Sequence, residues 1–229
     1  MTAVSTFRKE LEDAVLERHC AHHPMTQKWA RGELGRDAMM GWAVEHYHWV
    51  SNTAPANFAK MGDAPADVRA LLLENYLEER DPKNPHINIV LRFAEANGAD
   101  IDAVKAGRGL PTTEAWVAWQ RRVCKEEGWI AGVAATNIGT ESQSPLLYST
   151  LLPALREKYG FDEHTIEHFW LHVGADTEHG GRAFEALEKY CTTRELQERA
   201  VHFARESAKM RWFYFDGIYL HYELGYKLR

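Results

Sequence analysis

The spacing of the apolar residues limits the possible folds of this chain more than any other feature. They recur at steps of three and four residues along nearly the whole sequence, and alternating runs rich in β-branched residues are almost absent. This period is typical of amphipathic helices and predicts an all-α fold. The longer helices are expected at about residues 5–20, 36–60, 65–79, 86–95, 111–141, 162–190 and 192–226. Pro55 is expected to bend the second of these or to end it early.

Length and charge restrict the classes of partner. The 229 residues, 45% of them hydrophobic, favour one domain spanning residues 1–229. The net charge is −6 and the basic residues are scattered, so we expect no nucleic-acid partner. No apolar run is long enough for a membrane span, and the N-terminal residues do not resemble a signal peptide. From these two observations we expect no membrane partner and a cytoplasmic location, and the three isolated cysteines fit a reducing compartment.

A stripe of ionisable residues runs along the helix expected at 162–190. At about 100° per residue, His172, Asp176 and His179 project to one narrow face of that helix. Ala183 and Leu187 continue the same face, so we expect it to point towards the core. Two buried imidazoles and a carboxylate would each cost several kcal/mol if left unpaired. A metal ion removes this cost, and neutral histidines with carboxylates are ligands suited to Fe, Mn or Zn.

One helix supplies at most three ligands, so the remaining ligands must come from elsewhere. Glu141 shares a helical face with Ile130, Ala134 and Asn137 and is expected to point inwards at the end of its helix. Glu79 and His86 stand seven residues apart. Prolines 82 and 85 break any continuous helix between them, so we expect the broken segment to bring the two side chains together. Glu78 is an alternative to Glu79 in this role.

Each of these residues also has a simpler interpretation. A single buried histidine, such as His168, His202 or His221, is more often a hydrogen-bonded core residue than a ligand. The charged run at 78–81 is typical of a solvated helix face, and Glu141 alone is an exposed helix-end carboxylate as often as not. For His172, Asp176 and His179 taken together, the metal interpretation is the stronger one.

The order Glu79, His86, Glu141 and then His172-x-x-x-Asp176-x-x-His179 resembles the ligand pattern of the haem-oxygenase-like diiron oxidases and oxygenases. The run 29–34, with Trp42 and Tyr47, is similar to pyrroloquinoline-quinone synthase and thiaminase II of the same superfamily. The runs 134–137 and 185–188 resemble the terminal-alkene-forming fatty-acid decarboxylase of this group. The resemblance covers about residues 10–225.

This resemblance implies a haem-oxygenase-like bundle of about seven to eight helices that forms a homodimer. It also implies two Fe(II) ions, with Mn as an alternative metal, dioxygen as co-substrate and no haem. The metal ligands would be Glu79, His86, Glu141, His172, Asp176 and His179, and Glu141 would be the bridging, catalytic carboxylate. The implied activity is oxidative C–C cleavage, decarboxylation or N-oxygenation of a small metabolite bearing a carboxylate or an amine.

Departures from the related enzymes leave alternatives open. The self-sacrificing para-aminobenzoate-forming members carry a tyrosine just before the glutamate ligand, where this chain has Thr140. Thiaminase II needs a cysteine nucleophile on the helix that ends near Glu141, and Cys124 lies several turns too early. The quinone synthase needs no metal. Two alternative functions therefore remain: a metal-free oxidase resembling pyrroloquinoline-quinone synthase, and a non-catalytic ligand-binding protein of the same fold.

The sequence does not identify the substrate. Four basic residues are candidates for binding a substrate carboxylate: Lys60, Arg69, Lys209 and Arg211. The aromatic and apolar residues that could line a pocket cannot be told from core residues by sequence: Trp42, Tyr47, Phe58, Phe169, Trp212 and Phe213.

Overall fold

The computed structural model describes residues 5–83 and 85–228, and it describes the side chains of these residues except those of residues 175–180. The described residues are helical throughout their regular elements and contain no strand, which confirms the all-α prediction. The α-helices are α1 (Thr6–Leu16), α2 (Pro24–Ala30), α3 (Arg36–Ser51), α4 (Ala54–Gly62), α5 (Ala66–Glu79), α6 (His86–Ala96), α7 (Ile101–Ala106), α8 (Pro111–Glu126), α9 (Gly128–Val133), α10 (Ser144–Glu157), α11 (Glu167–Tyr190) and α12 (Arg194–Ile218). Short 3-10 or π-helical turns are η1 (Cys20–His22), η2 (Ala134–Ile138), η3 (Glu141–Gln143) and η4 (Tyr219–Glu223).

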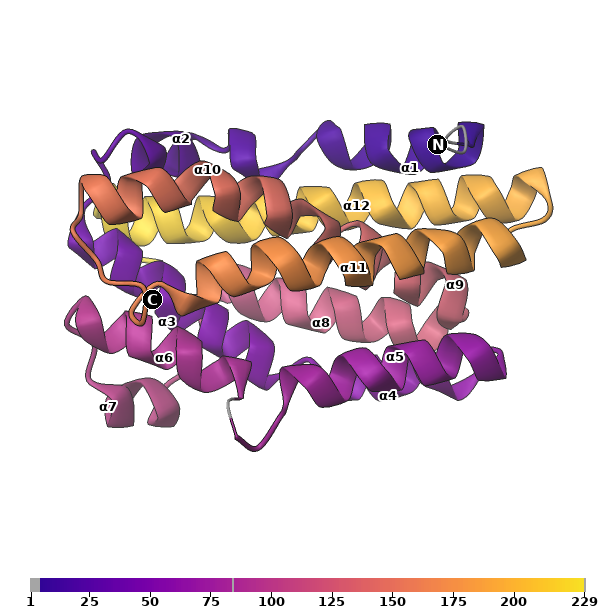
Figure 1. The fold of residues 1–229 in the computed structure, drawn as a ribbon, viewed down its shortest axis with the longest axis horizontal. Helices are drawn as coiled ribbons and strands as arrows, with labels where there is room; N and C mark the ends of the chain where they lie inside the picture. Colours follow the sequence, from indigo (N-terminus) through magenta and orange to yellow (C-terminus); the bar gives the residue numbers. More distant parts are fainter. Residues whose placement is uncertain (1–4, 84, 229) are drawn as a thin grey trace.

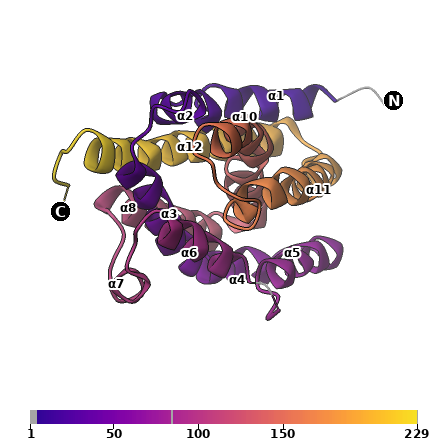
Figure 2. The same ribbon diagram turned by 60° about the vertical axis from the view of Figure 1, so that its left-hand side comes forward.

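The helices lie mostly along the long axis of the molecule, with α1, α10 and α12 on one side and α4 and α5 on the other (Figure 1). Helix α11 lies between these two sides and packs on α10, α5 and α6. The short α7 projects from one end, as the turned view shows (Figure 2). None of the described helices combines the length and apolar character that a membrane span requires.

The number of helices corrects one expectation. The described residues form helices α1 to α12, more than the seven to eight that the sequence resemblance implied. The stretch expected as one helix at 111–141 is divided, because Gly128 adopts a φ of +76° at the start of α9. Similarly, the helix expected at 36–60 ends at Ser51, and α4 starts with Pro55 in its first turn, where proline is tolerated.

Helix α11 also starts later than expected. Asp162 does not cap it; its carboxylate instead accepts a hydrogen bond from the backbone N–H of Thr165 in a turn, and the helix begins at Glu167. In contrast, α12 starts close to its expected position, and Thr193 caps it, since its hydroxyl accepts a hydrogen bond from the N–H of Leu196. The Cα positions of residues 162–166 therefore do not follow the helical projection, whereas those of residues 167–190 do.

The core consists of two large apolar clusters. One is rich in aromatic rings and is centred on Trp29, Trp42 and Phe169. The other, built mainly from aliphatic residues, includes Val123 and Leu187. Residues of both clusters, Tyr148 and Val90 from the first and Leu72 from the second, line a single cavity of about 300 Å³.

Candidate metal centre

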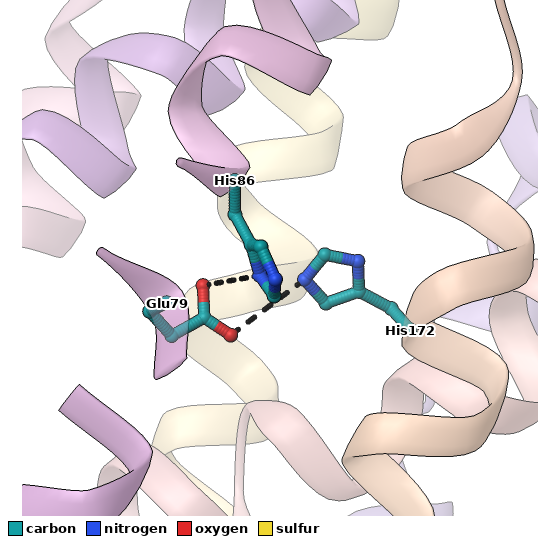
Figure 3. A group of neighbouring side chains, drawn as sticks. All are labelled: Glu79, His86 and His172. Carbon is teal, nitrogen blue, oxygen red and sulfur yellow. Dashed lines mark ion pairs between the residues drawn. The ribbon is translucent and has the colours of Figure 1, made fainter. Parts of the chain in front are cut away.

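Three of the predicted ligands converge at one wall of the cavity (Figure 3). The Nδ1 atom of His86 lies 2.8 Å from Oε2 of Glu79, and Nε2 of His172 lies 3.8 Å from Oε1 of the same carboxylate. One potential ligand atom from each of the three residues lies within 4.8 Å of the others. Two histidines and a carboxylate at this separation are suited to a shared divalent cation.

The break between α5 and α6 produces this convergence. Glu79 is the last residue of α5 and His86 is the first residue of α6, with Pro85 at the N-cap position. The two prolines prevent the helix from continuing, so the chain turns and both side chains reach the same point in the cavity. Glu78, the alternative ligand, is exposed and is not among the residues lining the cavity, so the structure places Glu79 there instead.

The two imidazoles present ring nitrogens to the carboxylate in different ways. Nδ1 of His172 lies 2.7 Å from the carbonyl oxygen of His168, a contact that orients the ring so that Nε2 faces Glu79. Nδ1 of His86 is buried and makes no hydrogen bond with any described residue, although it is at ion-pair distance from Glu79. A cation shared by the ring and the carboxylate would satisfy this nitrogen, so the donor set fits a metal ion.

The electrostatics of Glu79 support the same arrangement. Burial favours its neutral form, but contacts with His172 and then His86 outweigh burial and hold the pKa of Glu79 below its ordinary value. The side chain keeps 29% exposure while it lines the cavity. The carboxylate is therefore ionised and accessible from the cavity, as a metal ligand must be.

Glu141 lines the same cavity but stands apart from the three converging residues. It is the first residue of η3, and two residues separate it from the end of the π-helical turn η2. Its Oε2 accepts hydrogen bonds from Nδ2 of Asn137 at 2.8 Å and from Nδ2 of Asn75 at 3.4 Å. Among the described residues, Glu79, His86 and His172 form the one group of three potential ligand side chains that lie close together, and Glu141 lies outside this group.

The last two predicted ligands belong to helix α11. Asp176 and His179 follow His172 on α11, but their side chains lie outside the described residues. Their assignment as ligands stays a prediction from the helical spacing.

Several residues of the cavity wall were not selected from the sequence. His46, Asn75, Thr136 and Tyr148 line the cavity, and each comes from a different element. None of the six aromatic pocket candidates named from the sequence lines it. Trp42 and Phe169 are buried in the core, and Phe58 and Phe213 are among the exposed side chains. Helical position alone distinguishes inward from outward faces but not a cavity wall from a packed core.

Two further histidines border the site in neutral form. Burial lowers the pKa of His46 and of His168 well below the ordinary value. Nε2 of His168 lies 3.1 Å from the hydroxyl of Tyr148, and the His168 ring lies against those of His46 and His172. These rings hold the His172 side chain in place without adding positive charge to the cavity.

Of the four basic residues considered for a substrate carboxylate, one lines the cavity. Lys60 is 2% exposed and reaches the wall from the end of α4. The other three are occupied elsewhere. Arg211 donates to the carbonyl of Thr140, Arg69 donates to the carbonyl of Ala64, and the exposed Lys209 pairs with Glu206.

Comparison with known proteins identifies the family. The sequence profile of the family described as "Iron-containing redox enzyme" matches residues 40–212, and the chain belongs to this family. The chain is 29% identical to 4-aminobenzoate synthase of Nitrosomonas europaea, covering 96% of this chain and 94% of the relative. It is 23% identical to pyrroloquinoline-quinone synthase of Granulibacter bethesdensis, covering 93% of this chain and 86% of the relative.

Solved structures agree on the fold. A domain of unknown function with a haem-oxygenase-like fold from Shewanella denitrificans superposes with a TM-score of 0.81 at 18% identity, over 100% of this chain and 99% of the other. A TenA homologue from Pseudomonas syringae gives a TM-score of 0.80 at 14% identity, over 93% of this chain and 92% of the other. The haem-oxygenase-like fold inferred from the sequence is therefore confirmed.

Proposed function

We propose that this protein is a dioxygen-dependent non-haem diiron oxidase or oxygenase that acts on a small metabolite bearing a carboxylate or an amine. The observation that carries the proposal is the convergence of Glu79, His86 and His172 on the wall of a cavity. Membership of a family of iron-containing redox enzymes supports iron as the metal, with manganese as an alternative. We infer that residues 1–229 act as one domain and that two copies form a homodimer.

The ligand assignment extends from the three residues that converge. Glu79, His86 and His172 would hold one ion, and Glu141 on the same cavity would bridge to a second. Asp176 and His179 would complete the second position. Ferrous ions held by these residues would supply electrons for the reduction of dioxygen, and dioxygen would be the oxidant that takes electrons from the substrate.

Other residues around the cavity hold the metal-binding side chains in position and limit the access of water. The His168 carbonyl orients His172, and the amides of Asn137 and Asn75 orient Glu141. Trp49, Val50 and Leu72 contribute apolar surface to the wall, which excludes water from an oxidising centre. Such walls suit an organic substrate of modest size.

The proposal does not extend to formation of 4-aminobenzoate, the activity named for the Nitrosomonas relative. The resemblance places a tyrosine before the glutamate ligand in members with that activity, and here the residue is Thr140. Its hydroxyl is buried, contacts the carbonyl of Ala135 and the hydroxyl of Ser207, and is not part of the cavity lining. A different oxidation is therefore proposed.

Anaerobic titration of the metal-free protein with ferrous iron, followed by rapid mixing with dioxygen, tests the proposal. We expect two equivalents to bind and a transient visible absorption band to follow mixing. Glu79→Gln should remove bound iron, whereas Glu78→Gln, one residue away on the exposed side, should bind iron as the unmodified protein does. Absence of tight iron binding would reject the diiron function. Oxygen uptake without iron would then favour the metal-free oxidase, and ligand binding without oxygen uptake the binding protein.

A further inference from the structure

Lys60 is a buried cation in the wall of the cavity. It lies near the end of α4, and its side chain, 2% exposed, is among the largest that are fully buried. Burial of an ammonium group is costly unless its hydrogen bonds and its charge are both satisfied. In this structure the hydrogen bonds of the ammonium group are satisfied in part, and its charge is compensated only weakly.

Two neighbours accept hydrogen bonds from the Lys60 ammonium. Nζ lies 2.7 Å from Oγ1 of Thr136 and 2.9 Å from Oδ1 of Asn137. Both acceptors are correctly oriented, since the Thr136 hydroxyl donates to the carbonyl of Gly132 and the Asn137 amide nitrogen donates to Glu141. An ammonium group carries three donors, so these bonds leave one N–H for a ligand in the cavity.

The charge of Lys60 has no direct partner among the described carboxylates. Glu141 is the acid that acts on it, but Asn137 lies between the two groups and bonds to both. Burial lowers the pKa of Lys60, and the negative charge of Glu141 opposes that effect. If Glu141 binds a metal ion, its charge is shared with that ion and the attraction on Lys60 weakens.

The acidic and the basic side chains of the described cavity wall have different roles. The acids among the described lining residues are Glu79 and Glu141, both candidate metal ligands. The lysine and arginine side chains of the lining are Lys60 and Arg80, neither of which can bind a metal as a cation. Arg80 is less buried and is engaged by the Tyr76 ring and the carbonyl of Val50. The described wall therefore offers a free cationic donor for a substrate anion and no spare carboxylate for a substrate ammonium group.

We propose that Lys60 is the anion-binding group of the cavity and that the substrate is an organic acid whose carboxylate binds its ammonium group. This rests on the proposed oxidase function and narrows its substrate class from carboxylates or amines to carboxylates. The bound carboxylate would occupy the remaining N–H of Lys60 and neutralise its charge. The apolar part of the acid would lie against Trp49, Val50 and Leu72.

Isothermal titration of the metal-free protein with matched probes tests this inference without relying on activity. One set is benzoate, benzamide and benzylamine, and a second set is hexanoate, hexanamide and hexylamine. In at least one set the carboxylate should bind at least about tenfold more tightly than both the amide and the amine, because a charge-assisted hydrogen bond replaces a neutral one. Equal affinities within both sets, or tighter binding of the amine, would overturn the inference.

Variants at residue 60 then assign the preference to this lysine. Lys60→Met and Lys60→Gln should both lose the preference for the carboxylate. Lys60→Gln keeps an amide donor for Thr136 and Asn137, so it decides the matter if the methionine variant does not fold. Lys209→Met removes the same charge from an exposed site and should keep the preference. Retention of the preference in folded Lys60→Gln would assign anion binding to another group.

The ferrous titration separates this inference from the proposed function. Iron binding with no carboxylate preference would leave the oxidase function standing and remove the role of Lys60. Carboxylate preference that depends on Lys60, without iron binding, would retain the anion site and reject the diiron function.

Discussion

Asn137 links the carboxylate of Glu141 to the ammonium group of Lys60. Its amide nitrogen lies 2.8 Å from Oε2 of Glu141, and its carbonyl oxygen lies 2.9 Å from Nζ of Lys60. The residue is 1% exposed and belongs to the π-helical turn η2. Single π-helical turns within helices occur often at functional sites. Here the turn places one amide between a candidate metal ligand and a candidate substrate-binding group.

Asn137→Ala should weaken binding of the iron that Glu141 holds by about 10–100-fold, because loss of an outer hydrogen bond frees the ligand to rotate. Iron bound by Glu79, His86 and His172 should be retained, so anaerobic titration should show one equivalent bound tightly and one weakly. Asn75→Ala, which removes a longer bond of 3.4 Å to the same oxygen, should have the smaller effect. Unchanged affinity for both equivalents in Asn137→Ala would show that Glu141 needs no such support or binds no metal.

Metal binding should stabilise the fold, because Glu79, His86 and His172 come from three different helices. A free metal concentration of 100 times the dissociation constant adds about 2.7 kcal/mol to the free energy of unfolding. Thermal unfolding of metal-free protein with added ferrous or manganous ions should show this as a higher melting temperature. His86→Ala should abolish the rise, whereas the exposed His164→Ala should preserve it. An equal rise in both variants would mean that the metal binds elsewhere.

Local sequence signals predicted the part of the site that depends on local geometry. Prolines 82 and 85 stop the helix between Glu79 and His86, and the structure brings these two side chains together as expected. His172 faces the core because its helical face is apolar, which a projection of the sequence reveals. These features are determined by a few neighbouring residues, so no knowledge of tertiary packing was needed.

Features that depend on packing between distant elements were not predicted. The π-helical turn that presents Asn137 and Glu141 has no distinctive composition, and the sequence indicated only that both residues share a helical face. The cavity-lining role of His46 depends on how α3 packs against α6 and α8. The burial of Lys60 depends on η2 lying beside α4, since lysine is otherwise an exposed residue type.

Acidification should destabilise the protein partly through His19, which is 4% exposed and is not among the residues lining the cavity. Burial, followed by the charge of Arg211, lowers the pKa of His19 from 6.5 to about 3. Below pH 6.5 the unfolded chain binds a proton at this residue that the folded chain does not. The stability contributed by neutral His19 is therefore complete above that pH and is lost as the pH falls towards 3.

Denaturant unfolding between pH 7.5 and pH 5 measures this loss, which for one such group approaches about 1.4 kcal/mol per pH unit. His19→Gln should reduce the slope of stability against pH, even if it lowers stability overall. His202→Gln, at an exposed position on α12, should leave the slope as it is in the unmodified protein. Identical slopes for the two variants would contradict the role assigned to His19.

Gly139 allows the turn that carries Glu141 to lie against α12. A Cβ atom at this position would lie 2.7 Å from the carbonyl oxygen of Ala204 and would also meet the Cβ of Ser207. Its φ of −67° is accessible to any residue, so the requirement for glycine is steric. Gly139→Ala should destabilise the protein by about 1–3 kcal/mol through overpacking and should displace Glu141.

Gly174→Ala provides the matched comparison. Gly174 lies within α11, and no described heavy atom beyond its own helix lies within 4 Å of a Cβ placed there. Alanine should therefore raise the free energy of unfolding by about 0.5–1 kcal/mol, because it restricts the unfolded chain more than glycine does. Urea unfolding of the two variants measures both changes. If Gly139→Ala were as stable as the unmodified protein, α12 and η2 could move apart without a loss of stability. The close approach at Gly139 would then not be what positions Glu141.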